Sequence, residues 1–80
     1  MSGYDKQLYT PEARTKRFKR IAEKRTNRIL NDLRLLGNCA NKTLYKYEVR
    51  QVDKIFETIS NASYDTKLRF QTGKTKEFKL

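Results

Sequence analysis

The sequence predicts an all-α fold, an antiparallel two-helix hairpin with basic N- and C-terminal arms at residues 1–10 and 71–80. Two segments carry apolar side chains at the spacing of a helix that packs on one side, and a stretch rich in asparagine and tyrosine separates them. The 80 residues are enough for one small domain with a thin core. We therefore expect part of the apolar surface to be covered by a second copy of the chain or by another protein.

The first helix is expected over residues 11–36. Thr10 is suited to be its N-cap and Pro11 its first helical residue. Gly37 is expected to end the helix in the left-handed conformation, which glycine adopts without strain. The apolar positions of this helix fall within about 120° of arc at 100° per residue. They are Phe18, Ile21, Ala22, Ile29, Leu33 and Leu36.

Residues 37–47 are expected to form an ordered turn, and a second helix is expected to follow over residues 48–60. The apolar face of this helix consists of Val49, Val52, Ile55, Phe56 and Ile59. Two interpretations remain for the residues beyond it. We favour a helix that continues to about Phe70. The alternative is a break near Asn61 and a hairpin of KLRF and EFKL around Gly73, which would need a partner sheet.

The charge of the chain points to a polyanion as its ligand. It carries 19 Lys and Arg against 9 Asp and Glu, with a net charge of +10 and no histidine. Like charges one turn apart on the first helix repel one another, and bound phosphates would relieve this repulsion. Two other interpretations of the basic face are binding to an acidic protein surface and a role in solubility alone. The residues expected to bind nucleic acid there are Lys16, Arg17, Lys19, Arg20, Lys24, Asn27, Arg28, Asn31 and Arg34.

Arg25 projects from the middle of the first apolar stripe. A buried guanidinium needs a partner, and Asp53 or Glu57 on the second helix are the candidates. In the other interpretation, the stem of Arg25 packs while its charged head reaches water.

Aromatic side chains give two further hypotheses. Tyr45 and Tyr47 stand beside Lys42 and Lys46, a pattern that suits the stacking of single-stranded bases, and these four residues are expected to extend the nucleic-acid site. The alternative is that the tyrosines close one end of the core. A basic tail with spaced apolar residues suits a docking peptide, although it could equally be disordered. The residues expected to bind a protein are Phe70, Phe78 and Leu80.

The sequence contains no catalytic constellation. Histidine is absent, the 3 glycines form no phosphate-binding loop, and the lone cysteine, Cys39, has no second cysteine with which to build a zinc site. We expect no catalytic residue, no cofactor and no metal. The sequence has no apolar run of signal-peptide or membrane-span type, so a cytoplasmic location and no membrane partner are expected.

Several short motifs run through residues 25–59. They are Arg25-Thr26-Asn27, Leu33 to Asn38 with Asn41, the tyrosines before the second helix, and Val52 with Ile55-Phe56, and the closing EFKL accompanies them. With these motifs the chain resembles small basic proteins of Gram-positive bacteria carried by mobile elements and phages. It departs from their pattern after Ser60, in NASYDT. The resemblance implies an accessory role near replication genes, as for the member thought to partner a primase-polymerase in staphylococcal cassette elements.

These features predict a non-catalytic accessory protein that binds nucleic acid and assists a replication or transfer enzyme of polymerase or helicase type. DNA is favoured over RNA, and single strands are favoured over duplex. Two alternatives stay open. One is an adaptor or inhibitor of phage type that binds protein only, and the other is an RNA- or ribosome-binding protein.

Overall fold

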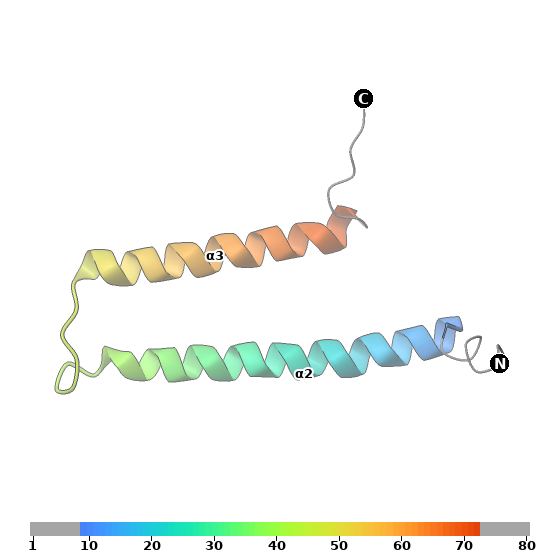
Figure 1. Cartoon of the computed structure of the whole chain (residues 1–80), viewed down its shortest axis with the longest axis horizontal. Coiled ribbons are helices and arrows are strands. Elements are labelled where there is room, and N and C mark those ends of the chain that lie inside the picture. The colour runs from blue at the N-terminus through green and yellow to red at the C-terminus, as the bar shows by residue number, and fades with distance from the viewer. Residues whose placement is uncertain (1–8, 73–80) are drawn as a thin grey trace, which may run out of the picture. The chain divides into compact units, whose positions relative to one another are not determined.

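A computed structural model describes residues 9–72, which form two α-helices and a short 3₁₀ helix (Figure 1). The elements are α2 (Pro11–Gly37), η1 (Asn38–Ala40) and α3 (Val49–Thr72), and the described part of the chain contains no strand. The predicted all-α class and its two helices are therefore confirmed. The chain divides into two units between Tyr45 and Lys46, so that α2 and η1 belong to the first and α3 to the second.

The start of α2 is the one that the sequence predicts. Thr10 has an extended backbone, with φ −67° and ψ 155°, and its Oγ1 accepts a hydrogen bond from the Ala13 backbone N–H at 3.1 Å. Pro11 begins the helix, where its missing N–H costs no hydrogen bond. Glu12 places a negative charge in the first turn, where the helix dipole favours it.

The end of α2 differs from the prediction. Gly37 is not left-handed but continues the right-handed helix with φ −60° and ψ −26°, and Asn38 follows it with φ −67° and ψ −19°. The chain tightens into η1, and the Asn38 N–H bonds the carbonyls of Leu35 and Leu36. A 3₁₀ turn satisfies the last carbonyls of a helix without any residue at positive φ. Glycine is therefore not required at position 37, where an added Cβ would meet nothing within 4 Å.

Asn41 organises the connection that follows η1. Its Oδ1 accepts a hydrogen bond from the Thr43 N–H at 2.9 Å, and its carbonyl accepts from Leu44 N–H at 3.1 Å and Tyr45 N–H at 2.9 Å. An asparagine that bonds the backbone two residues ahead imitates a backbone turn. The predicted ordered turn is found, with a side chain holding it.

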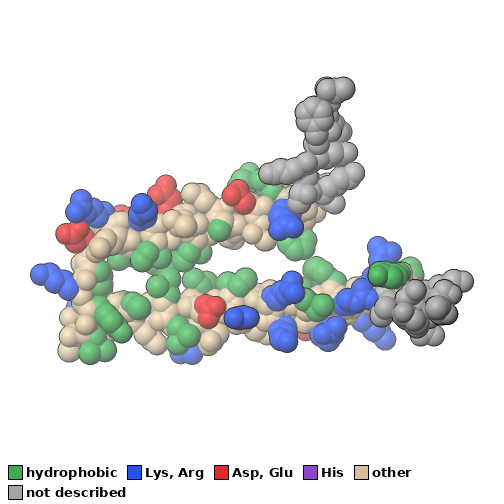
Figure 2. All heavy atoms as spheres, in the orientation of Figure 1, with side chains coloured by type: hydrophobic (Ala, Val, Ile, Leu, Met, Phe, Trp, Pro, Cys, Tyr) green, Lys and Arg blue, Asp and Glu red, His purple; other side chains and the backbone are tan. Residues whose placement is uncertain are grey.

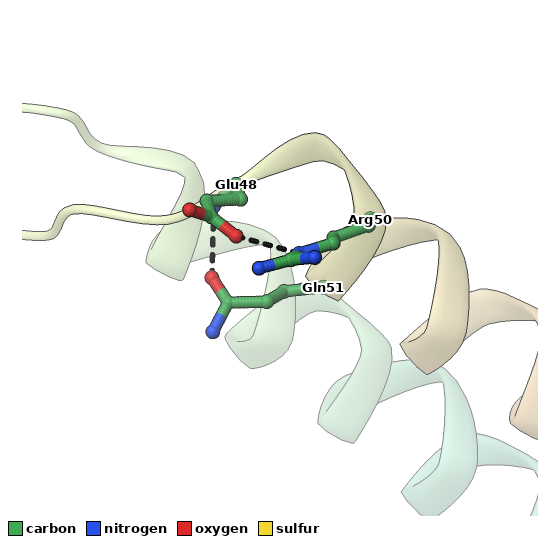
Figure 3. Close-up of polar contacts among 3 residues, drawn as sticks. All are labelled: Glu48, Arg50 and Gln51. Carbon is green, nitrogen blue, oxygen red and sulfur yellow. Dashed lines mark hydrogen bonds and ion pairs between the residues drawn. The ribbon is translucent and has the colours of Figure 1, made fainter.

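Glu48 forms the entry to α3 (Figure 3). Its backbone N–H donates to Gln51 Oε1 at 2.8 Å, while its carbonyl accepts from the N–H groups of Gln51 and Val52. Its carboxylate does not cap the helix but pairs with Arg50, whose Nε lies 2.8 Å from Glu48 Oε1. Gln51 is the third residue of the helix, and its side chain bonds back to the N–H of Glu48, the residue before the helix. This bond forms half of a capping box.

The second helix continues beyond Asn61, as we favoured, and reaches Thr72. The hairpin alternative is wrong for KLRF, because residues 67–70 are helical, and EFKL lies outside the described residues. Within this stretch, the hydroxyl of Thr66 is satisfied by the helix itself, because its Oγ1 donates to the Ala62 carbonyl at 2.9 Å. Residues 71–72, expected in the C-terminal arm, are also helical; the remainder of that arm and residues 1–8 lie outside the described residues.

No described residue is fully buried. In α2, Ile21, Ala22, Leu33 and Leu36 are half-buried, whereas Phe18 remains 60% exposed. The expectation that a partner covers part of the apolar surface stays a prediction. Within residues 9–72, neither helix combines the length and the apolar character needed to cross a membrane.

Candidate nucleic-acid interface

A cationic face covers the N-terminal half of α2. We define it as Lys16, Arg17, Lys19, Arg20, Lys24 and Arg28. Lys16, Arg20 and Lys24 follow one another at four-residue spacing on the side away from the apolar stripe, and all three are exposed. Figure 2 shows Lys and Arg side chains gathered over this half of the helix. From residue 16 to residue 28 the only acidic side chain is Glu23.

The charges of Lys16, Arg20 and Lys24 are not neutralised within the described part of the chain. The ion pair found there joins Glu48 and Arg50, so these three side chains have no described carboxylate within 4.0 Å. Like charges at this spacing destabilise a helix by about 0.2–0.5 kcal/mol per pair. A helix face with charges of both signs would not carry this cost. On this face, an external anion would offset it.

The polar side of α2 also carries amide side chains, from Asn27 onward. Asn27, Asn31 and Arg34 lie on the same side as Lys16 and Arg20, and all three are exposed. Arg34 Nη2 donates a hydrogen bond to Asn31 Oδ1 at 2.9 Å. The candidate site therefore combines a cationic part with an amide-rich part that contains one oriented arginine.

Arg25 is exposed on the apolar side of α2. Exposure suits the interpretation in which the charged head reaches water while the stem covers apolar neighbours. Pairing of Arg25 with Asp53 or Glu57 stays a prediction.

The predicted stacking platform lies at the boundary between the two units. Lys42 and Tyr45 belong to the first unit, whereas Lys46 and Tyr47 belong to the second. The Tyr45 side chain is 50% exposed, and Tyr47 is half-buried. A role for either ring in base stacking stays a prediction.

The predicted protein-binding residues are only partly within reach of the structure. Phe70 lies on α3 with its side chain 68% exposed. Phe78 and Leu80 lie outside the described residues. Cys39 is exposed in η1, and within residues 9–72 no three His, Cys, Asp or Glu side chains are arranged to hold a metal ion.

The sequence interpretation missed two features. The first is a pair of large side chains on the polar side of α3. Leu68 lies about 170° from the centre of the apolar stripe at 100° per residue, and Tyr64 precedes it by one turn. Asn38 continues the amide-rich side of α2, because Gly37 keeps the helical conformation. A helical wheel extended to residue 68 would have shown the position of Leu68. The position of Asn38 was missed because Gly37 was expected to be left-handed and to end the helix before it.

Comparison of the chain with models of protein families gave no match, and neither curated proteins nor solved structures gave one.

Proposed function

We propose that this protein is a non-catalytic nucleic-acid-binding factor whose cationic face contacts phosphates. The observation that carries the proposal is the row Lys16, Arg20 and Lys24, exposed at four-residue spacing and without a neutralising carboxylate in the described chain. Each phosphate bound by such a side chain releases counterions, which favours association. The net charge of +10 favours the same class of ligand.

We further propose that DNA is the ligand in the cytoplasm, with single strands preferred, and that the protein assists a replication or transfer enzyme. The resemblance of residues 25–59 to proteins of mobile elements supports this role. Large exposed apolar side chains, such as Phe56 at 51% and Phe70 at 68% exposure, support a protein partner of the polymerase or helicase type or a second copy of the chain.

The proposal is tested by measuring the binding of labelled single-stranded DNA, duplex DNA and RNA between 50 and 200 mM salt. If Lys16, Lys19, Arg20 and Lys24 each hold one phosphate of a single strand, log K should fall with log[salt] with a slope of about −2.8, or about 50-fold over this range. The double change Arg20→Gln/Lys24→Gln should reduce the slope to about −1.4 and the loss to about sevenfold.

Lys54→Gln/Lys67→Gln is the matched control, because it removes the same charge from α3 and leaves the cationic face unchanged. The control should keep the slope of the native protein. Equal effects of the two double changes would mean that net charge and not this face governs binding. Absence of binding to all three polymers would favour an adaptor that binds protein only, and stronger binding to RNA would favour the RNA-binding alternative.

A further inference from the structure

The exposed polar side of α2 has a second part beyond its cationic half. On this side lie Asn27, Asn31, Arg34 and, one turn further, Asn38. Asp32, the nearest acidic residue in the sequence, lies at a different angle around the helix, about 100° from Asn31. The side that carries cations at its N-terminal end therefore carries amides and a single arginine at its C-terminal end.

Asparagine lowers the stability of a helix when it lies in the helix interior, as Asn27 and Asn31 do. Within a helix it is less favourable than alanine, lysine, glutamine or glutamate, because its short amide competes for backbone hydrogen bonds. Solubility alone would be served better by those residues. Asn27 and Asn31 lie inside the helix, so their presence points to a use of their hydrogen-bonding groups, whereas Asn38 lies at the helix end, where asparagine is favoured for local reasons.

The hydrogen bond between Asn31 and Arg34 decides what this part can recognise. Asn31 Oδ1 accepts from Arg34 Nη2 at 2.9 Å, which uses one of the two lone pairs of the amide oxygen and orients the guanidinium. The amide N–H groups of Asn31 and the other guanidinium N–H groups of Arg34 remain to face a ligand. The guanidinium of Arg34 therefore presents donors from a side chain that a hydrogen bond positions.

Building on the proposed nucleic-acid binding, we propose that the Asn31–Arg34 pair contacts base edges and selects guanine. Guanine presents two neighbouring acceptors, O6 and N7, which a guanidinium can contact together. Adenine presents N7 beside an amino donor, so a guanidinium N–H would meet another donor at the place where guanine offers O6. The same edge is open in a single strand and in the major groove, so the preference holds for either form.

The test uses three oligothymidylates that differ at two central positions, which hold guanine, adenine or 7-deazaguanine. 7-Deazaguanine keeps O6 and replaces the N7 acceptor with a C–H group. The native protein should bind the guanine strand about fivefold more tightly than either other strand, which is the low end of what one arginine–guanine pair provides.

Arg34→Lys keeps the positive charge and removes the two-point contact. It should bind the three strands equally, with the salt slope of the native protein and unchanged helix content by circular dichroism. Lys24→Gln is the matched control, since it should weaken binding to all three strands alike and keep the guanine preference.

The inference is overturned if the native protein binds all three strands equally, or if Arg34→Lys retains the preference. Either result leaves the proposed function intact as long as Arg20→Gln/Lys24→Gln still lowers the salt slope. If the native protein bound none of the three strands, both the guanine preference and the proposed function would be overturned.

Discussion

Arg20→Glu should make the ligand-free protein more stable while it weakens nucleic-acid binding. On α2, Arg20 lies three or four residues from Lys16, Arg17, Lys24 and Glu23, which gives three repulsive pairs and one attractive pair. Glutamate reverses each sign. Three pairs become attractive and one becomes repulsive, so the net gain equals that of two pairs. Each of these pairs changes from about 0.2–0.5 kcal/mol unfavourable to about the same amount favourable, and the free energy of unfolding should rise by about 1 kcal/mol.

The gain should appear in thermal unfolding followed by circular dichroism at low salt and at one protein concentration. For a chain of this size, about 1 kcal/mol raises the midpoint by about 4–8 °C. Arg20→Gln should give half of the gain, because it removes the charge without reversing it. In about 1 M salt, where the screening length falls to about 3 Å, the difference between the proteins should largely disappear.

Lys54→Glu is the control with the same change of charge. Lys54 lies four residues after Arg50 and three before Glu57, so glutamate there relieves one repulsion and creates another, and no net local gain is expected. If Arg20→Glu lowers the midpoint, or if Lys54→Glu raises it equally, local repulsion on α2 is not the cause. The argument that an external anion relieves it would then fail.

The two ends of α2 supply further predictions. Gly37→Ala should stabilise the protein by about 0.4–1 kcal/mol in urea unfolding, because position 37 is right-handed and an added Cβ meets nothing within 4 Å. A loss of stability would instead indicate the left-handed conformation. Thr10→Ala should cost about 1 kcal/mol by removing the bond from the Ala13 N–H, and Thr10→Ser should restore most of it. Equal stability of the two Thr10 variants would show that the hydroxyl cap contributes nothing.

The helices could be predicted from sequence because each has a local cause. Thr10 and Pro11 predict the start of α2 by chemistry that involves only their neighbours, and the apolar period predicts both helical segments. The state of Gly37 could not be predicted in this way. Its conformation depends on whether the last carbonyls of α2 are satisfied by a 3₁₀ turn or by a left-handed residue, and glycine permits both.

The candidate site was predictable in part. The cationic face follows from helical spacing alone, and the structure places Lys16, Arg20 and Lys24 exposed along one side. The bond between Asn31 and Arg34 could not be read from spacing, because neighbours three residues apart can also leave each other for water.

Cationic side chains are concentrated toward the N-terminal part of α2, and large aliphatic side chains toward its C-terminal part. The cationic face ends at Arg28, and Ile29, Leu30, Leu33, Leu35 and Leu36 follow immediately. Ile29, Leu33 and Leu36 lie on the side of the helix away from the cations, so a bound strand would leave them able to contact a protein at the same time. Substitutions of Lys16 or Lys24 on the cationic face and substitutions of Leu33 or Leu36 on the apolar side should accordingly impair the two activities separately.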